Sequence, residues 1–255
     1  MPSAGKYGPV IVRLVMAAFG AFALTWGLTT FGIFWSQSTP DRVAERILTG
    51  DRYKLDLLYG LARTQDENGR EPWVRPSTLR SAAIIRLRMA EESSATNDWA
   101  LFDLNLKKLD EYLLRSLSDS PLDPFLWVVL FWCRNMQVGF VAEHLDFLAM
   151  SYRIGPNEGW VAARRNRVAM LVYNSLSSEL QKSVQREFVQ LVGFGFVKEA
   201  VEVLVGPGWG IRDTLLPQLE SIPEYRREAF AKAVYDRGYD VVVPGIISPG
   251  QRPWR

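Results

Sequence analysis

An uncharged run near the start of the chain constrains the fold more than any other feature. It begins at Leu14 and ends at Trp35, and none of its 22 residues is Asp, Glu, Lys or Arg. As a helix rising about 1.5 Å per residue it would be about 33 Å long, enough to cross the hydrocarbon core of a bilayer. A cleaved signal peptide has a shorter apolar core of about 7–15 residues, followed by a small-x-small site. Here the triplet Ala21-Phe22-Ala23 would cut the run in its middle, so residues 14–35 are predicted to form an uncleaved transmembrane anchor.

The charged residues on either side of this run predict its orientation. Lys6 and Arg13 precede it without an acidic neighbour, whereas Arg42 and Arg46 follow it interleaved with acidic residues. Basic residues accumulate on the cytoplasmic side of membrane spans, and large domains are translocated largely regardless of their charge. We therefore expect a cytoplasmic tail at residues 1–13 and, in a Gram-negative bacterium, an inner-membrane protein with a periplasmic domain. A membrane tether whose domain faces the cytoplasm is the alternative.

Composition limits the chemistry that the chain can perform. It has 255 residues, a formal net charge of +2, one cysteine and one histidine. Nucleic-acid-binding proteins usually carry an excess of basic residues, and a net charge so close to zero shows no such excess. No nucleic acid is therefore expected as a partner. Cys133 has no second cysteine for an internal disulfide, and His144 has no second histidine for a metal site. The glycine-containing segments 193–196 and 206–210 lack the Lys-Ser/Thr pair of a phosphate loop. We therefore predict no catalytic, cofactor-binding or metal site, and expect the protein not to be an enzyme.

Beyond the anchor, the sequence reads as a succession of helices. Polar or proline-containing helix starts recur at residues 39–40, 97, 123–124, 156–157 and 177–178. Each precedes a segment with helical spacing of apolar residues, as expected for N-cap residues with proline in the first turn. The only strand-like segment is the short "YDVVV" at 239–243. The pattern predicts an all-α domain over residues 36–238, followed by an extended, Pro/Gly-rich tail over residues 239–255.

The spacing of two helix starts favours a helical repeat. Pro124 and Pro156 lie 32 residues apart, and each is followed by a tryptophan, Trp127 or Trp160. Tetratricopeptide repeats have a period of about 34 residues, each with two antiparallel helices. Residues 124–157 resemble one such repeat, although they depart from the pattern where small and aromatic residues are expected. The resemblance implies a degenerate tetratricopeptide-like α-solenoid of antiparallel helix pairs.

The layout of the whole chain carries a further resemblance. An anchor is followed by "VAERILTGD", and "SPLDPFLWVVLFW" leads to "LAMSYRIGPNEGWVAARRN". This layout is similar to that of the small tetratricopeptide-like membrane proteins that accompany surface-polysaccharide assembly in some bacteria. The resemblance implies an accessory or scaffold protein beside a polymerase, ligase or exporter. Its partners would be other membrane or envelope proteins, with the polysaccharide as a further candidate, and it implies no catalytic residue.

The segment "SYRIGPNEGWVAARRNR", residues 151–167, combines aromatic side chains and arginines at one helix entrance. Its arginines lie on more than one face of the following helix, so they cannot all be buried. One interpretation is an inter-helix clamp, in which arginines bind carbonyl and carboxylate groups inside the domain. The other is a partner-binding groove lined by Tyr152, Arg153, Trp160 and Arg164, because solenoids recognise partners on such inner faces.

The C-terminal segment offers one more candidate binding residue. Helix formation is excluded by Pro244, Pro249 and Pro253, yet Trp254 is too apolar for a tail that makes no contacts. The segment either folds back along the last helices as a cap or docks on another protein as an extended peptide. Trp254 is therefore a candidate partner-binding residue.

A carbohydrate-active enzyme remains the alternative from another class. Glu158 lies beside Trp160, and Asp213 follows "GWGIR", so the fold could place two carboxylates near aromatic rings. Glycosidase carboxylates lie within about 5–9.5 Å of one another. A structure that separates Glu158 from Asp213 would argue against this alternative.

Overall fold

The computed structural model describes the backbone of residues 8–68 and 74–247, and the side chains of residues 10–28, 39–67 and 74–247. Over these residues the chain is helical and contains no strand, which confirms the all-α prediction and excludes a strand at 239–243. The α-helices are α1 (Gly8–Leu48), α2 (Leu55–Asn68), α3 (Pro76–Ala95), α4 (Trp99–Asp119), α5 (Pro124–Val138), α6 (Leu145–Ile154), α7 (Gly159–Leu171), α8 (Ser178–Phe194), α9 (Val197–Val205), α10 (Arg212–Leu215) and α11 (Glu224–Asp236). Short 3-10 helices are η1 (Ala142–His144), η2 (Tyr173–Ser175), η3 (Trp209–Ile211) and η4 (Leu216–Ser221).

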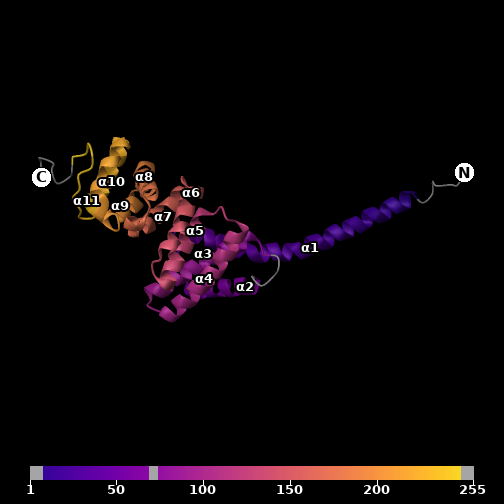
Figure 1. Cartoon of the computed structure of the whole chain (residues 1–255). Coiled ribbons are helices and arrows are strands. Elements are labelled where there is room, and N and C mark those ends of the chain that lie inside the picture. The colour runs from indigo at the N-terminus through magenta and orange to yellow at the C-terminus, as the bar shows by residue number, and fades with distance from the viewer. Residues whose placement is uncertain (1–7, 69–73, 248–255) are drawn as a thin grey trace.

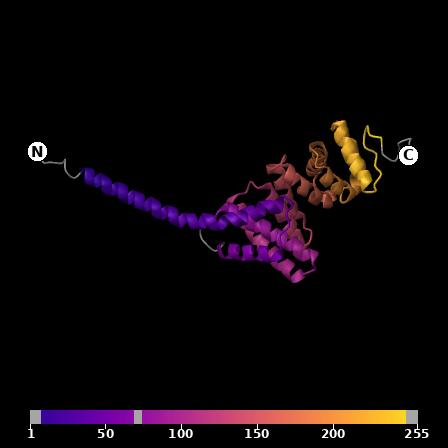
Figure 2. The same ribbon diagram turned by 180° about the vertical axis from the view of Figure 1, so that it is seen from behind.

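Helix α1 is one continuous helix that projects from the domain, while α11 lies at the opposite end of the molecule (Figure 1). The view from behind shows the same arrangement (Figure 2). The start predicted at residues 39–40 is therefore wrong, because Pro40 lies inside α1. Packing explains the difference: Val43 and Ala44 are buried, and Ser81 in α3 donates a hydrogen bond to Asp41 over 2.7 Å. These tertiary contacts offset the loss of a helical hydrogen bond at proline, which costs about 3 kcal/mol.

The N-terminal part of α1 is apolar and exposed. Val10–Leu28 has a mean hydropathy of 1.8, and none of it is buried. Phe19 and Leu28 are 73% and 72% exposed. A core helix of a soluble protein would bury such side chains against its neighbours. Within the residues that the structure describes, this is the one helix long and apolar enough to cross a membrane.

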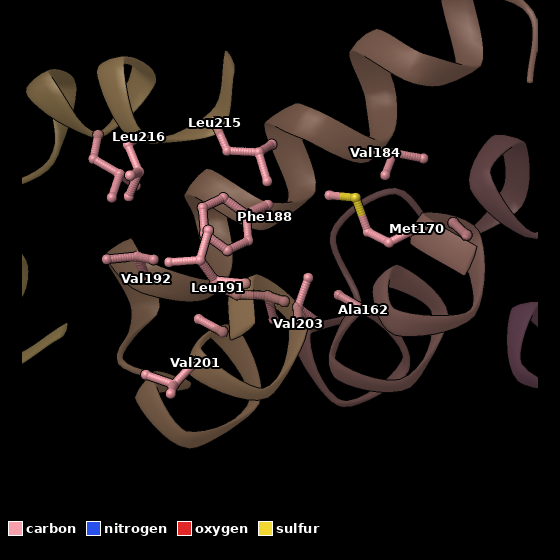
Figure 3. Packing of buried hydrophobic residues seen from close by; sticks show 14 of the residues in the cluster. Ala162, Met170, Val184, Phe188, Leu191, Val192, Val201, Val203, Leu215 and Leu216 are labelled. Atoms are coloured by element: carbon pink, nitrogen blue, oxygen red, sulfur yellow. The ribbon is translucent and has the colours of Figure 1, made fainter. Parts of the chain in front are cut away.

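The domain has two large apolar clusters, which meet at α5 and α7. The first is built mainly from α3, α4 and α5, around side chains such as Leu109 and Leu126. The second is built mainly from α7, α8, α9 and α11, around Phe188. The ring of Phe188 lies among aliphatic side chains such as Leu191 of α8, Val203 of α9 and Leu215 of α10 (Figure 3). Val161 of α7 belongs to the first cluster and Phe131 of α5 to the second. Helices α5 and α7 therefore join the two halves.

The order in which helices pack follows the order of the chain. Successive helices contact one another in the pairs α3·α4, α4·α5, α5·α6, α7·α8 and α8·α9. Next-but-one helices contact one another in the pairs α1·α3, α5·α7, α7·α9 and α9·α11. Most contacts are thus made between elements that are close in sequence, and the domain grows in one direction from α1 to α11 (Figure 1).

Two of the predicted helix starts are confirmed by their hydrogen bonds. Asp123 precedes α5, and its carboxylate accepts from the backbone N–H groups of Phe125 and Leu126 over 2.9 and 3.2 Å. Ser177 precedes α8, and its hydroxyl accepts from the N–H group of Leu180 over 3.3 Å. These side chains satisfy N–H groups that have no partner within the first turn of a helix.

Two other starts are shifted by one to three residues. Asp98, not Asn97, caps α4, and Asn97 adopts a left-handed conformation with φ of 58°. Helix α7 begins at Gly159, so Pro156 and Asn157 lie in the turn before it. Close packing places this turn, because a Cβ atom added to Gly155 would lie 2.5 Å from the Pro124 ring.

The described part of the C-terminal segment folds back on the last helices. Val243 is only 2% exposed, and the ring of Tyr239 lies edge-on to that of Trp209, 5.1 Å between centroids. Arg227 of α11 donates a hydrogen bond to the carbonyl oxygen of Pro244. Residues 239–247 therefore act as a cap on the end of the domain. Trp254 lies outside the described residues.

Candidate functional site

The two neighbouring arginines of α7 point to different sides of the helix. Arg165 is fully buried, whereas Arg164 is partly exposed. Successive residues of an α-helix are about 100° apart around its axis, so adjacent side chains meet different neighbours. Arg165 faces α6 and α8, and Arg164 faces the end of α1 and α5. The arginine-rich segment thus contains two separate arrangements.

Arg165 is the centre of a buried clamp. Its Nε donates to Glu187 of α8 over 3.0 Å. One terminal nitrogen donates to the carbonyl oxygen of Ser151 over 2.7 Å, and the other to that of Gly155 over 3.0 Å. The guanidinium also lies 4.1 Å from the ring centroid of Tyr152. These contacts hold α6, the turn after it, α7 and α8 together, as the clamp interpretation expected of an arginine in this segment.

Glu187 completes the clamp from the other side. Its second carboxylate oxygen accepts from the Tyr152 hydroxyl over 2.6 Å and from the Asn166 side chain over 3.3 Å. Burial raises the pKa of Glu187, while Arg165 and the hydrogen bonds act in the opposite direction. Burial and the nearby carboxylate raise the pKa of Tyr152 well above its usual value, so its hydroxyl stays protonated and donates. The clamp is therefore a buried structural network in which both oxygens of the Glu187 carboxylate accept hydrogen bonds.

Arg164 connects α7 to the end of the long helix. One terminal nitrogen donates to the carbonyl oxygen of Leu48, the last residue of α1, over 2.7 Å. The other donates to the carbonyl oxygen of Trp160 over 3.2 Å. The guanidinium lies 5.9 Å from the ring centroids of both Trp160 and Phe125, whose own centroids are 5.1 Å apart. Partial burial lowers the pKa of Arg164, while the nearby carboxylate of Glu91 acts in the opposite direction.

Beside Arg164 lies a hollow of about 750 Å³, here named the α1–α7 hollow. Its walls come from the end of α1 and from α3, α5, α7 and α9, so it lies where the two apolar clusters meet. The aromatic residues of the wall are Phe125, Trp132, Trp160 and Phe196. The charged ones are Glu91, Arg164, Arg167, Lys198, Glu199 and Glu202. A volume of a few hundred to a thousand Å³ is typical of ligand-binding clefts.

A second hollow, of about 570 Å³, lies between α6 and α8 and is here named the α6–α8 hollow. Tyr152 and Arg153 line it, whereas Trp160 and Arg164 line the α1–α7 hollow. The single groove predicted for these four residues is therefore corrected to two hollows. The cause is the turn between α6 and α7, because it sends the residues before and after it to different sides. Tyr152 is also buried, and its hydroxyl is already bound to Glu187, so it offers the hollow little free surface.

The two carboxylates of the glycosidase alternative line neither hollow. Glu158 is exposed at the N-terminus of α7. Asp213 is exposed in α10, with Arg212 at 3.7 Å from it. The arrangement gives no support to a carboxylate pair acting on a glycosidic bond.

The single histidine and cysteine have structural surroundings. His144 Nδ1 lies 3.2 Å from the side-chain oxygen of Asn135, and its ring stacks on Phe147. Cys133 is buried, and burial raises the pKa of its thiol to about 12. Such a thiol is protonated at neutral pH and is a poor nucleophile. Within the described residues, no group of three His, Cys, Asp or Glu side chains could hold a metal ion.

Sequence reasoning missed several residues of the α1–α7 hollow. Trp132, Arg167 and Lys198 come from three different helices, and no short motif contains any two of them. Only the helix packing brings them together with Trp160 and Arg164, which the sequence did indicate. A scan against protein-family models and searches of curated proteins and of solved structures found no match to this chain.

Proposed function

We propose that the protein is a membrane-anchored helical-repeat scaffold or accessory protein of a bacterial cell-envelope complex. The observation that carries this proposal is the continuity of α1, whose exposed apolar part and buried C-terminal part belong to one helix. A helix that continues into a packed core holds the domain at a fixed distance from the bilayer. From Trp35, the last residue of the predicted anchor, to Pro40 the helix rises about 7.5 Å at about 1.5 Å per residue. The domain would begin at the outer edge of the lipid headgroups, where other membrane and envelope proteins are accessible.

The packing order of the helices supports a repeat scaffold. The contacts α5·α7, α7·α9 and α9·α11 resemble those between equivalent helices of successive repeats. We interpret the domain as a degenerate tetratricopeptide-like solenoid on this basis. Such arrays bind proteins or polymers along their faces, and Arg153, Trp160 and Arg164 lie on the two hollowed faces of this one. The layout that resembles polysaccharide-assembly proteins favours a complex that makes or exports a surface polysaccharide, with envelope proteins as partners.

The charge pattern around the anchor supports one orientation for this proposal. Lys6 and Arg13 favour a cytoplasmic N-terminus, which places the domain in the periplasm, on the outer face of the inner membrane. An orientation with the domain in the cytoplasm would make the same fold a cytoplasmic tether. The two orientations differ in which compartment holds the C-terminus, and reporter fusions distinguish them.

A topology experiment gives the first prediction. Alkaline phosphatase fused after Arg255 is expected to be active, because it folds only in the oxidising periplasm. A fluorescent protein that matures only in the cytoplasm is expected to stay dark at the same position. Both fusions are compared at equal expression by immunoblot. An inactive phosphatase together with a bright fluorescent protein would place the domain in the cytoplasm.

A genetic experiment tests the scaffold role itself. Deleting the gene is expected to reduce surface polysaccharide, measured as cell-bound and released sugar. The full chain should restore it, whereas residues 36–255 secreted freely into the periplasm should not, because they lack the anchor that concentrates the domain at the membrane. Full restoration by the secreted domain would contradict an anchored scaffold. An unchanged polysaccharide level in the deletion strain would remove the polysaccharide assignment.

A further inference from the structure

The α1–α7 hollow presents aromatic ring surfaces to solvent. Trp160 is 36% exposed and Trp132 and Phe196 are partly exposed, although all three pack against the domain. Rings on the wall of an open cleft offer flat apolar faces at little entropic cost, because their side chains are already held in place. Flat faces of this kind favour a ligand that has a broad apolar surface of its own. The C–H faces of sugar rings meet that requirement.

The charged residues of the same wall have both signs, and two of its three carboxylates already have a cationic neighbour. Glu91 is paired with Arg88 at 3.1 Å, and Glu202 lies 3.8 Å from Arg237. Arg167 and Lys198 are exposed, and among the described side chains no ion pair is found for either. A wall with both donors and acceptors suits hydroxyl groups, which donate and accept at once. The unpaired cations favour a ligand that also carries an anion.

Arg164 connects the wall of the hollow to the end of α1. Its bonds to the carbonyl oxygens of Leu48 and Trp160 use two of its five N–H donors, which leaves three for a ligand. Leu48, Thr49 and Gly50 line the hollow themselves. A ligand in the hollow would therefore contact both halves of the domain and the end of the long helix. The binding site therefore exists only when all of these helices are folded and packed together.

We propose that the α1–α7 hollow binds an acidic oligosaccharide, a short run of sugar rings that carries carboxylate groups. Trp160 and Trp132 stack on the sugar rings, Arg167 and Lys198 bind the carboxylates, and Glu199 accepts hydrogen bonds from hydroxyl groups. The proposal deepens the scaffold role by giving it a ligand, and it rests on that role only for its biological setting. Binding is measured on the purified chain, so a failure here leaves the topology and genetic tests untouched.

An acidic peptide is the other ligand class that unpaired cations would attract. An extended peptide has a backbone with an N–H and a C=O group at every residue, which asparagine and glutamine side chains match with their own donor and acceptor. No asparagine or glutamine is among the described residues that line the α1–α7 hollow. The carboxylates of Glu91, Glu199 and Glu202 can accept hydrogen bonds from the several hydroxyl groups of a sugar ring, whereas the ionised side chains of an acidic peptide offer no donor. The observations therefore favour the oligosaccharide.

Titration of the purified full-length protein in detergent micelles tests the proposal, with tryptophan fluorescence and calorimetry as readouts. Three probes of matched length are compared: an oligosaccharide of hexuronic acids, a neutral oligosaccharide of hexoses and a peptide of glutamic acids. The uronic acid probe is expected to bind saturably, with the neutral probe at least about tenfold weaker because it lacks charge-assisted bonds. The peptide is expected not to saturate. A peptide that binds as tightly as the uronic acid probe, or a uronic acid probe that does not saturate at millimolar concentration, overturns the proposal.

Variants locate the site. Arg167→Gln combined with Lys198→Gln is expected to weaken binding of the uronic acid probe by about tenfold or more. Both side chains are exposed, so this variant keeps the fold, as checked by circular dichroism. Trp160→Leu should weaken both sugar probes alike. The matched control, Lys182→Gln with Arg186→Gln, removes two exposed cations of α8 that line neither hollow and should change affinity less than about twofold. Equal losses in the variant and the control would contradict the assignment.

Discussion

Replacing Glu187 by alanine is expected to lower the free energy of unfolding by about 3–5 kcal/mol. The change leaves the guanidinium of Arg165 buried without a carboxylate, and it removes the acceptor of the Tyr152 hydroxyl. A domain of ordinary stability unfolds at a cost of about 5–15 kcal/mol, so one substitution would remove about a fifth or more of the total. Urea titration followed by circular dichroism, in the detergent used for purification, measures the loss.

Two companion variants separate the clamp from a general effect of charge removal. Arg153→Ala removes an exposed arginine of the same segment and should change the unfolding free energy by less than about 0.5 kcal/mol. Arg165→Met combined with Glu187→Leu should cost less than Glu187→Ala alone, because no charge is left buried and unpaired. A loss below about 1 kcal/mol for Glu187→Ala would contradict the role of this ion pair in holding α6, α7 and α8 together.

The buried clamp around Arg165 could be predicted from the sequence only in part. The composition of residues 151–167 left two interpretations open, and arginines that bind carbonyl and carboxylate groups inside the domain were one of them. It did not distinguish Arg165 from Arg164, because the choice depends on α8, which lies further along the chain. One signal was available in α8: Glu187 lies on the apolar stripe with Val184, Phe188 and Leu191, where a carboxylate needs a buried partner.

Local signals predicted most helices, and they failed where tertiary packing opposed them. Asp123 and Ser177 form caps within one turn, so the nearby sequence suffices to place them. The start predicted at residues 39–40 has the same local form, but burial of Val43 against α3 extends α1 through it. For a related reason, the sequence indicated only some of the residues that line the α1–α7 hollow. Its walls come from helices far apart in the chain, and no spacing rule connects them.

Introducing two arginines into the apolar part of α1, as Phe22→Arg with Leu24→Arg, is expected to remove the protein from the membrane. An arginine near the centre of a spanning helix costs about 2.5–3.5 kcal/mol on insertion, so the pair costs about 5–7 kcal/mol. Leucine, isoleucine, phenylalanine and valine contribute about 0.3–0.6 kcal/mol each. The seven such residues left in Val10–Leu28 would supply only about 2–4 kcal/mol. The penalty exceeds this gain, so insertion becomes unfavourable.

The measurement is the share of the protein that stays in the membrane pellet after an alkaline carbonate wash. The matched control places the same two arginines on the exposed face of α4, as Leu104→Arg with Leu114→Arg, at sites 53% and 45% exposed. Both variants add two positive charges to exposed apolar positions, but only the first places them in the proposed span. The control should remain in the pellet while the α1 variant leaves it. If both remain, the exposed apolar surface of α1 is covered by another protein rather than by lipid, because a protein partner could provide polar groups for the two guanidinium ions that a bilayer core cannot.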